Sequence, residues 1–410
     1  MTDLAPPGHR GPPTLRGNVR AMPRTIWVLL AGTFINRFGT FVLPFLVLYL
    51  RDLGYSAPQG GIAVGMYGVG GIAAVGIGGL LADRIGRRNS VALSMFGSAA
   101  ATLALSQAHT LGTILPLTAL VGLFAESYRP AASALIADHV SAERRVTAFA
   151  LNRLAVNLGW AFGPALGGVM ASRSFFILFA ADAATSAVYG IIALVALPHG
   201  VRSSREDERR GEATRSLLAD RGFLIFLAAM FCTAVVYMQS ATTFALQVRA
   251  QGFSNETYGL LLSLNGLIVV LFELPLSAFT QRHPATRMVA LGAFLVGAGF
   301  FLVGWSSTLV ALVGCTAIFT FGEILGAPQA SVFVADRSPH HLRGRYQAAF
   351  GTMFGLAAVV GPIAGTAAFH RRPTLLWGAC GVLGLISAGL ALTAGRRPIP
   401  DIALEVSPPR

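Results

Sequence analysis

Residues 79–88 read GLLADRIGRR and connect two apolar stretches, residues 58–82 and 90–108. A segment that holds Asp83, Arg84, Arg87 and Arg88 within a few positions cannot stay in the hydrocarbon core of a membrane. Each flanking stretch has about the length, roughly 20 residues, that a helix needs to cross that core. The sequence therefore predicts two membrane-spanning helices joined by a short charged turn at one membrane surface.

Apolar stretches of this length recur along the whole chain. Of the 410 residues, 54% are hydrophobic and only 12% are charged, which is too few charges to cover a water-soluble protein of this size. We therefore expect an all-α integral membrane protein with twelve transmembrane helices. The expected helices cover residues 25–50, 58–82, 90–108, 111–137, 147–171, 174–197, 222–248, 257–279, 286–306, 308–335, 345–369 and 373–394.

The two halves of the chain match each other at a constant spacing. Pro130 and Asp138 are repeated 198 positions later as Pro328 and Asp336, and Gly163 is repeated as Gly361. Such a repeat predicts two pseudo-symmetric bundles of six helices that face each other across a central cavity. The expected segments are a tail (1–24), the first bundle (25–198), a hydrophilic linker (199–221), the second bundle (222–395) and a second tail (396–410).

The positive charges are placed unevenly between the expected helices. The chain has a formal net charge of +13, and all of its 31 basic residues are arginine. Most lie in alternate loops, and the opposite loops hold only Arg51, Arg173, Arg249, Arg371 and Arg372. Arginine-rich loops face the cytoplasm, so we expect both tails and the linker there, in a cell inner membrane, with residues 1–24 disordered and no removable signal peptide. This pattern accounts for the basic charge without a nucleic-acid partner.

Motifs for catalysis or cofactor binding are missing from the sequence. Cys232, Cys315 and Cys380 lie in separate apolar stretches, so they predict neither a disulfide framework nor a metal site. There is no phosphate-binding loop of the GxxxxGK[ST] type and no Ser/His/Asp set with access from a membrane surface. We expect neither an enzyme nor a cofactor, and the chain is expected to act as a monomer.

The loop at residues 79–88 resembles the signature loop of the major facilitator superfamily of transporters, with every usual position filled. The resemblance implies the fold described above and a latch on the cytoplasmic side, which breaks when that side opens. The residues that match the latch are Gly79, Asp83, Arg84, Gly86, Arg87 and Arg88, together with Asp138 at the end of the fourth helix. The alternative interpretation is a charged loop that serves only to set orientation.

A second motif lies in the expected fifth helix, where residues 159–168 read GWAFGPALGG. It resembles the GxxxGPxxGG signature of the twelve-helix drug/proton antiporters within the superfamily. Glycines at this spacing also make a flat helix face for close packing, so ordinary packing is the alternative. The residues concerned are Gly159, Gly163, Pro164, Gly167 and Gly168.

Charged side chains in mid-membrane are the strongest candidates for a functional site, because burying each costs at least about 2.5 kcal/mol. Glu126 and Arg129 are three residues apart on one helix and can pair, either for structure, as a lining of the cavity, or as a proton-coupling site in which protonation of Glu126 releases Arg129. Glu323, one position from the repeat mate of Glu126, is a second proton-coupling candidate. The predicted site comprises Asn36, Arg37, Glu126, Arg129, Asn157, Asp182, Asn265 and Glu323.

Two further charges, Arg153 and Glu273, lie nearer the cytoplasmic helix ends, where snorkelling or gate pairing explains them. Aromatic residues such as Tyr67 and Trp160 can line a cavity, but packing is the commoner role of each in a membrane helix.

These features predict proton-coupled export, by alternating access, of a small amphipathic organic compound that can be cationic. Glu126 or Asp182 would be protonated from outside as the substrate leaves. One alternative is uptake by a proton/peptide symporter, whose motifs are weakly similar to residues 36–38 and 157–159, although the acids of that family's first helix are replaced by Thr33 and Asn36. Another alternative is a membrane receptor without transport. The expected partners are a small-molecule substrate, protons and the lipid bilayer.

Overall fold

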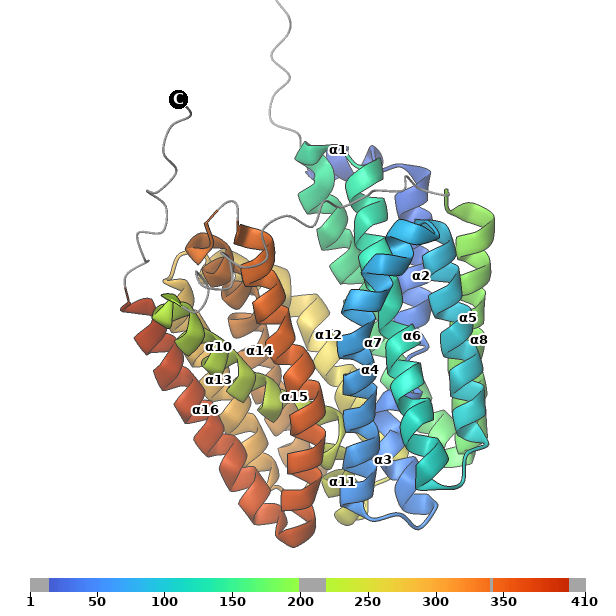
Figure 1. Cartoon of the computed structure of the whole chain (residues 1–410). Helices are drawn as coiled ribbons and strands as arrows, with labels where there is room; N and C mark the ends of the chain where they lie inside the picture. The colour runs from blue at the N-terminus through green and yellow to red at the C-terminus, as the bar shows by residue number, and fades with distance from the viewer. Residues whose placement is uncertain (1–14, 199–218, 340–341, 398–410) are drawn as a thin grey trace, which may run out of the picture.

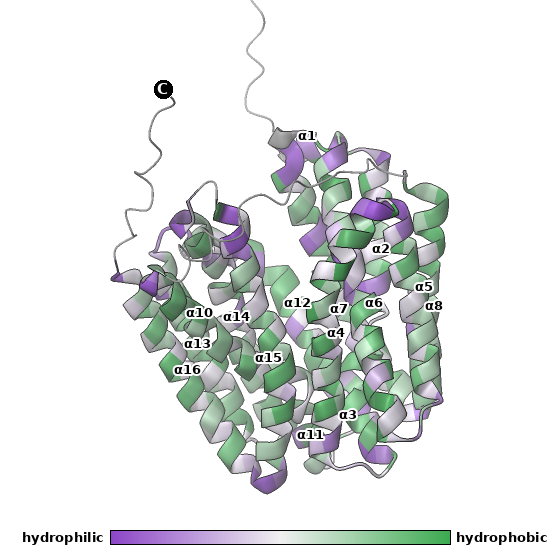
Figure 2. Ribbon diagram, viewed as in Figure 1, coloured by the Kyte–Doolittle hydropathy of each residue, from purple (hydrophilic) through white to green (hydrophobic). Residues whose placement is uncertain are grey.

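The computed structural model describes residues 15–198, 219–339 and 342–397, and the elements in these ranges are all helical. The helices form two groups side by side, with α3 and α11 at the end opposite α1 (Figure 1). Figure 2 shows hydrophobic residues along the bodies of the helices and hydrophilic residues concentrated at their ends. This distribution is the one a lipid bilayer requires.

The first group contains eight helical elements. These are α1 (Leu15–Arg20), α2 (Arg24–Phe38), α3 (Val42–Asp52), α4 (Ala57–Arg84), α5 (Arg87–Ser106), α6 (Leu111–His139), α7 (Ala142–Arg173) and α8 (Phe175–Ala196). Here α4 packs against α6, α5 lies against α6 and α8, and α2 contacts α7 and α8.

The second group repeats this arrangement. Its elements are α10 (Arg221–Tyr237), the short 3-10 helix η1 (Met238–Ala241), α11 (Thr243–Ala250), α12 (Asn255–Thr280), α13 (Ala285–Val303), α14 (Leu309–Arg337), α15 (Arg343–Arg371) and α16 (Pro373–Gly395). The two groups meet along α4 with α15 and along α7 with α12.

Eleven spans in the described part of the chain are long and apolar enough to cross a membrane. The remaining predicted span corresponds to α5, which has 20 residues and therefore a length of about 30 Å. It is more polar than the others because it begins with Arg87 and Arg88 and carries buried serines on its inner face, such as Ser94 and Ser98. The all-α membrane fold predicted from the sequence is confirmed.

The structure corrects the prediction for the first tail. Residues 15–20, which we expected to be disordered, form α1, and α1 contacts α7. The buried Asn18 donates a hydrogen bond from Nδ2 to Oγ1 of Thr147 at 3.5 Å. Residues 1–14, most of the predicted linker and residues 398–410 lie outside the described residues.

The first predicted helix of each half is broken, whereas we expected continuous helices over residues 25–50 and 222–248. The first break separates α2 from α3 at residues 39–41, and the second separates α10 from α11 at residues 238–242. The breaks lie about 198 residues apart, so they are a repeated feature. The sequence does not reveal them, because small and polar residues such as Thr40 and Gln239 also occur within continuous membrane helices. Contacts from distant helices satisfy the freed backbone groups, as described below for Asp182.

The backbones of α4 and α6 approach each other closely at glycine residues, which have no side chain to keep them apart. A Cβ atom added to Gly70 of α4 would lie 1.9 Å from the carbonyl oxygen of Ala119, and one added to Gly122 of α6 would lie 2.1 Å from that of Tyr67. By contrast, a Cβ added to Gly76, on the same helix as Gly70, meets no atom within 4 Å. The contact of α4 with α6 therefore depends on these two glycines.

This difference predicts opposite effects for two matched substitutions in α4. Gly70→Ala should destabilise the protein by at least about 2 kcal/mol, because the new methyl group forces the two backbones apart. Gly76→Ala should leave stability unchanged or raise it slightly, since alanine favours helix. Thermal unfolding of the purified proteins, followed by size-exclusion chromatography, measures both effects. Equal unfolding temperatures for the two variants would contradict this account of the contact.

Candidate functional site

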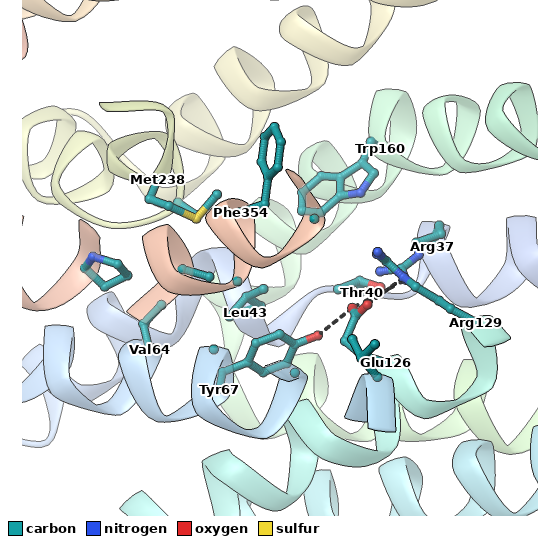
Figure 3. Close-up of a pocket in the computed structure, with 18 of the residues that line it drawn as sticks. Arg37, Thr40, Leu43, Val64, Tyr67, Glu126, Arg129, Trp160, Met238 and Phe354 are labelled. Atoms are coloured by element: carbon teal, nitrogen blue, oxygen red, sulfur yellow. Dashed lines mark hydrogen bonds and ion pairs between the residues drawn. The ribbon is translucent and has the colours of Figure 1, made fainter. Parts of the chain in front are cut away.

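A cavity of about 600 Å³ lies between the two halves of the protein. The first half contributes side chains from α2, α3, α4, α6 and α7, and the second half contributes side chains from η1 and α15 (Figure 3). The residues labelled in the figure are Arg37, Thr40, Leu43, Val64, Tyr67, Glu126, Arg129, Trp160, Met238 and Phe354. Aromatic and aliphatic side chains thus surround a few charged groups, which is typical of a site for an amphipathic small molecule.

Glu126 is the centre of the charged groups. Its Oε2 lies 2.5 Å from Nε of Arg129, and its Oε1 lies 3.4 Å from Nη2 of Arg37. The hydroxyl of Tyr67 donates a hydrogen bond to the same Oε1 at 3.3 Å (Figure 3). The Glu126–Arg129 pair expected from the sequence is therefore formed, and Arg37 and Tyr67 complete it.

The two arginines differ in their surroundings. The side chain of Arg37 is only 5% exposed and also donates a hydrogen bond to Oη of Tyr128 at 3.2 Å. The side chain of Arg129 is 58% exposed. Arg37 is therefore held inside the first half, whereas Arg129 projects into the cavity with only Glu126 as its charged partner in the described part of the chain.

Asp182 has a different environment from the one we expected. Its Oδ2 accepts hydrogen bonds from the backbone N–H groups of Phe41 and Val42, both at 3.0 Å. These are donors at the start of α3 that have no partner within their own helix, and a carboxylate is favourable there. Asp182 lines a small internal cavity of the first half together with Asn36, and it is not part of the wall between the halves. Its contacts give it the role of a cap, and its part in proton coupling stays a prediction.

Glu323 lies in the second half on α14. Its Oε2 accepts hydrogen bonds from Oη of Tyr237 at 3.1 Å and from Nδ2 of Asn265 at 3.0 Å. Asn265 stands 198 residues after Tyr67, so the two repeats place corresponding side chains against their acids. The difference is that no arginine of the described residues pairs with Glu323.

Asn157 contacts the other half of the protein. Its Nδ2 donates a hydrogen bond to Oε2 of Glu273 at 3.0 Å, and Arg153 forms an ion pair with the same carboxylate. These contacts join α7 to α12. Asn157 therefore belongs to a contact between the halves, away from the wall of the central cavity where we placed it. Snorkelling or gate pairing was expected for Arg153 and Glu273, and the structure shows that the two side chains pair.

The cavity is closed at the end that holds α3 and α11. Arg249 pairs there with Asp52 at 2.6 Å, and Oη of Tyr258 donates a hydrogen bond to the carbonyl of Pro44 at 3.2 Å. A Cβ added to Gly68 of α4 would lie 2.7 Å from the carbonyl oxygen of Ala358 in α15.

Toward the opposite end, α4 and α15 diverge. A Cβ added to Gly76, Gly79, Gly344 or Gly351 would meet nothing within 4 Å. The residues that line the cavity include Pro130 and Ser133, which lie beyond Glu126 on α6 toward this end. The cavity therefore opens toward the end that carries the turn between α4 and α5.

The turn between α4 and α5 carries the predicted latch residues. Gly86 has φ +85°, a conformation that side chains other than glycine rarely adopt, so glycine is required at this position. Arg87 is 7% exposed and forms an ion pair with Asp138 of α6. Two of the residues predicted to form the latch, Arg87 and Asp138, are therefore paired, and their role as a latch stays a prediction. Asp83 lines a surface cavity of about 450 Å³ together with this pair, and Arg84 is exposed. Arg88 donates a hydrogen bond from Nε to Asn89 at 3.5 Å.

The glycine-rich motif of residues 159–168 packs α7 against two helices. A Cβ at Gly159 or Gly163 would clash with the backbone at Phe38 of α2, at 2.7 and 2.5 Å. A Cβ at Gly168 would lie 2.7 Å from the carbonyl oxygen of Asn255, and Pro164 lies against Gly259, both on α12. A Cβ at Gly167 would lie 3.1 Å from the ring of Phe45 and 3.3 Å from that of Phe41, which is closer than ordinary contact. The motif therefore brings α7 into contact with its own half and with the other half.

Several side chains that line the central cavity were not predicted from the sequence. Phe354 and Met238, from the second half, were not selected, because a single Phe or Met in an apolar helix gives no functional signal. Tyr128, which holds Arg37, was missed for the same reason. Tyr67 was named only as one of several aromatic residues that can line a cavity, although its repeat mate Asn265 is polar and, like Tyr67, donates a hydrogen bond to a glutamate.

Comparison with known proteins identifies the family. A family model described as Major Facilitator Superfamily matches residues 29–362 and 238–407. The transporter YqjV of Bacillus subtilis, described as uncharacterised and of the same type, is 28% identical over 349 residues, which cover 83% of this chain and 85% of the relative. A Na(+), Li(+), K(+)/H(+) antiporter of Planococcus maritimus is 24% identical over 407 residues, covering 91% of this chain and 94% of the relative.

Solved structures share the fold. A POT family transporter in complex with 5-aminolevulinic acid superposes with a TM-score of 0.75 at 14% identity, covering 92% of this chain and 98% of the other. A bacterial homologue of the human lysosomal transporter Spinster, in an inward-facing and unoccupied conformation, superposes with a TM-score of 0.74 at 14% identity, covering 91% and 96%. The family model spans most of the sequence, and the chain belongs to the major facilitator superfamily of membrane transporters.

Proposed function

We propose that this transporter exports small amphipathic organic compounds in exchange for protons, by alternating access. The observation that carries the proposal is the acid Glu126, which is held by Arg37 and Arg129 on the wall of a cavity between the two halves. A charge in this position is costly unless it is paired, and its pairing changes when the acid is protonated. The cavity has the size and the mixed lining that an amphipathic molecule of modest size needs.

Alternating access is supported by the different contacts at the two ends of the cavity. The Asp52–Arg249 pair and the hydrogen bond from Tyr258 to Pro44 close one end, and the other end is open. If the arginine-rich loops are cytoplasmic, as their distribution predicts, this is the inward-open state. Reorientation would break the contacts at α3 and α11 and bring the opposite ends of α4 and α15 together.

Protonation of Glu126 would change the shape and charge of the cavity. The neutral acid no longer attracts Arg129, whose side chain is already 58% exposed. Arg37 would keep its hydrogen bond to Tyr128. Proton binding at Glu126 would therefore act mainly on Arg129, and loss of the proton would re-form the pair.

The direction of transport is supported by the motif in α7 and by one relative. The glycine-rich motif is similar to that of drug/proton antiporters, and the relative from Planococcus maritimus is named an antiporter. The membrane location that we propose is a cell inner membrane, with both tails and the linker in the cytoplasm.

A second candidate function is uptake of a small anion together with a proton. The excess of arginine in the cavity favours it, since Arg37 and Arg129 stand against the single acid Glu126 among the described residues of its lining. Release of Arg129 by protonation would offer a cation to a substrate carboxylate, so proton and anion would bind together. The direction of coupled flux separates this candidate from export.

A flux experiment tests the main proposal and its coupling residue. Inverted membrane vesicles that contain the protein, with an acidic interior, should accumulate ethidium in exchange for protons. Glu126→Gln should lower this gradient-driven accumulation by at least about fivefold, because coupling free energies are typically 1–3 kcal/mol. Glu256→Gln is the matched control, since Glu256 is an exposed acid in the first turn of α12 and outside the cavity.

Two results would contradict the main proposal. One is gradient-driven flux that is the same in wild type and Glu126→Gln. The other is accumulation of an anion only in vesicles of the opposite orientation, which would establish the second candidate.

The role of Asp182 as a helix cap predicts different effects for two substitutions. Asp182→Asn should keep gradient-driven flux, because its amide oxygen can still accept from the N–H groups of Phe41 and Val42. Asp182→Ala should destabilise the protein by about 1–3 kcal/mol, since the buried N–H of Val42 loses its partner and that of Phe41 keeps only the carbonyl of Gly39. Thermal unfolding and the vesicle assay measure both effects. A stable Asp182→Asn variant without coupled flux would instead assign the proton to Asp182.

A further inference from the structure

A second cavity, of about 110 Å³, lies inside the second half of the protein. It is enclosed by α10, α13, α14 and α15, and its walls are mainly apolar, with Met230, Val289 and Val296 among them. Three glycines of α13 and α14 line it. Gly292 and Gly322 lie where the two helices are in close backbone contact, and Gly326 leaves room for an added Cβ. Glu323 is the single carboxyl group among the described residues that line it.

One oxygen of Glu323 has no partner. Its Oε2 accepts the hydrogen bonds from Tyr237 and Asn265, and Oε1 accepts none from the described residues. No arginine of the described chain lies within ion-pair distance of it, unlike Glu126. A carboxylate in apolar surroundings is stabilised by a cation, so the cavity offers a place for a positive charge that the protein itself does not fill.

Phe354 of α15 separates this cavity from the central one. Its ring lines both cavities, and its side chain is 41% exposed. The smaller cavity, with a volume of about 110 Å³, has less than a fifth of the 600 Å³ of the central cavity. It therefore fits one short arm of a substrate and not the whole molecule.

The geometry points to a ligand for this cavity, and the inference rests on the proposed transport function. We propose that the cavity behind Phe354 receives a short alkyl arm that ends in an ammonium group, with that group against Oε1 of Glu323. The apolar body of the substrate remains in the central cavity, beside Trp160 and Tyr67. The arginines of the first half repel the ammonium group and direct it toward the second half.

This placement makes the substrate and a proton exclude one another at Glu323. A protonated Glu323 offers no charge to an ammonium group, so binding of one disfavours binding of the other. The titratable group that faces Glu323 most closely is Tyr237 of α10, and the Arg153–Glu273 pair of α7 and α12 acts from farther away. The parts of α13 and α15 that line the cavity carry no charged side chain.

Two compounds of nearly equal shape test the inference. Phenethylamine has an ammonium group at the end of a two-carbon arm, and 2-phenylethanol has a neutral hydroxyl in the same place. Full-length protein in lipid nanodiscs should bind the amine at least about tenfold more tightly than the alcohol, as one charge-assisted hydrogen bond of about 1.5–3 kcal/mol requires. Glu323→Gln should remove this preference and leave the affinity for the alcohol nearly unchanged.

A substitution that keeps the carboxyl group tests the cavity itself. Gly326→Ala adds a methyl group to its wall, and the new Cβ would lie 3.5 Å from Cα of Gly292, which is an ordinary contact. This variant should weaken binding of both compounds. Gly314→Ala, on the same helix but with nothing within 4 Å of the added Cβ, is the matched control and should bind both compounds as wild type does.

Three results would overturn the inference: equal binding of amine and alcohol by wild type, no binding of either, or a preference that persists in Glu323→Gln. Each is independent of the vesicle assay. If gradient-driven flux of ethidium is present and the amine preference is absent, the inference fails and the proposed function stands. If the preference is present without coupled flux, the proposed function fails and the site stands.

Discussion

The pairing of charges inside an apolar bundle is the constraint on which the arrangement of the first half depends. An isolated charge in mid-membrane costs at least about 2.5 kcal/mol, so Glu126 must lie beside a cation. Arg129 provides it from the same helix, and Arg37 provides a second one from α2. With the hydroxyl of Tyr67, this group ties α2, α4 and α6 together at the depth of the central cavity. In the second half a buried ion pair joins Arg337, at the end of α14, to Asp220, just before α10. The acid Glu323 is not part of it and is held by neutral donors of the described residues.

Much of the fold could be predicted because lipid requires long apolar helices, and hydropathy records them residue by residue. The breaks at residues 39–41 and 238–242 could not, because the small and polar residues found there, such as Thr40, Gln239 and Ser240, also occur within continuous membrane helices. Their stability comes from partners far along the chain. Asp182 lies 141 positions from Phe41, and Gln239 donates a hydrogen bond to the carbonyl of Gly361 at 3.0 Å. A prediction made from a short stretch of sequence considers only one of the two partners in each of these contacts.

The candidate site was predictable in part for a similar reason. Glu126 and Arg129 are three residues apart, and the helical period alone brings them together. Asn157 was predicted in the cavity because it is a buried amide, but the direction in which it points depends on the packing of α7 against α12. Phe354 is one of 27 phenylalanines, and only the packed structure shows that it stands between two cavities.

The seams between the halves have a mechanical consequence. Where α4 meets α15 and α7 meets α12, glycines such as Gly68 and Gly259 lie against the backbone of the opposite helix. Such surfaces have few interdigitating side chains that would have to separate, so one half can move against the other along them at little cost in packing. The contacts that oppose such a movement are then polar ones, such as the Asp52–Arg249 pair near α3 and α11 and the Arg153–Glu273 pair between α7 and α12. In the alternating-access cycle that we propose, these polar contacts would set the speed of the conformational change, and the glycine-lined contacts would set its path.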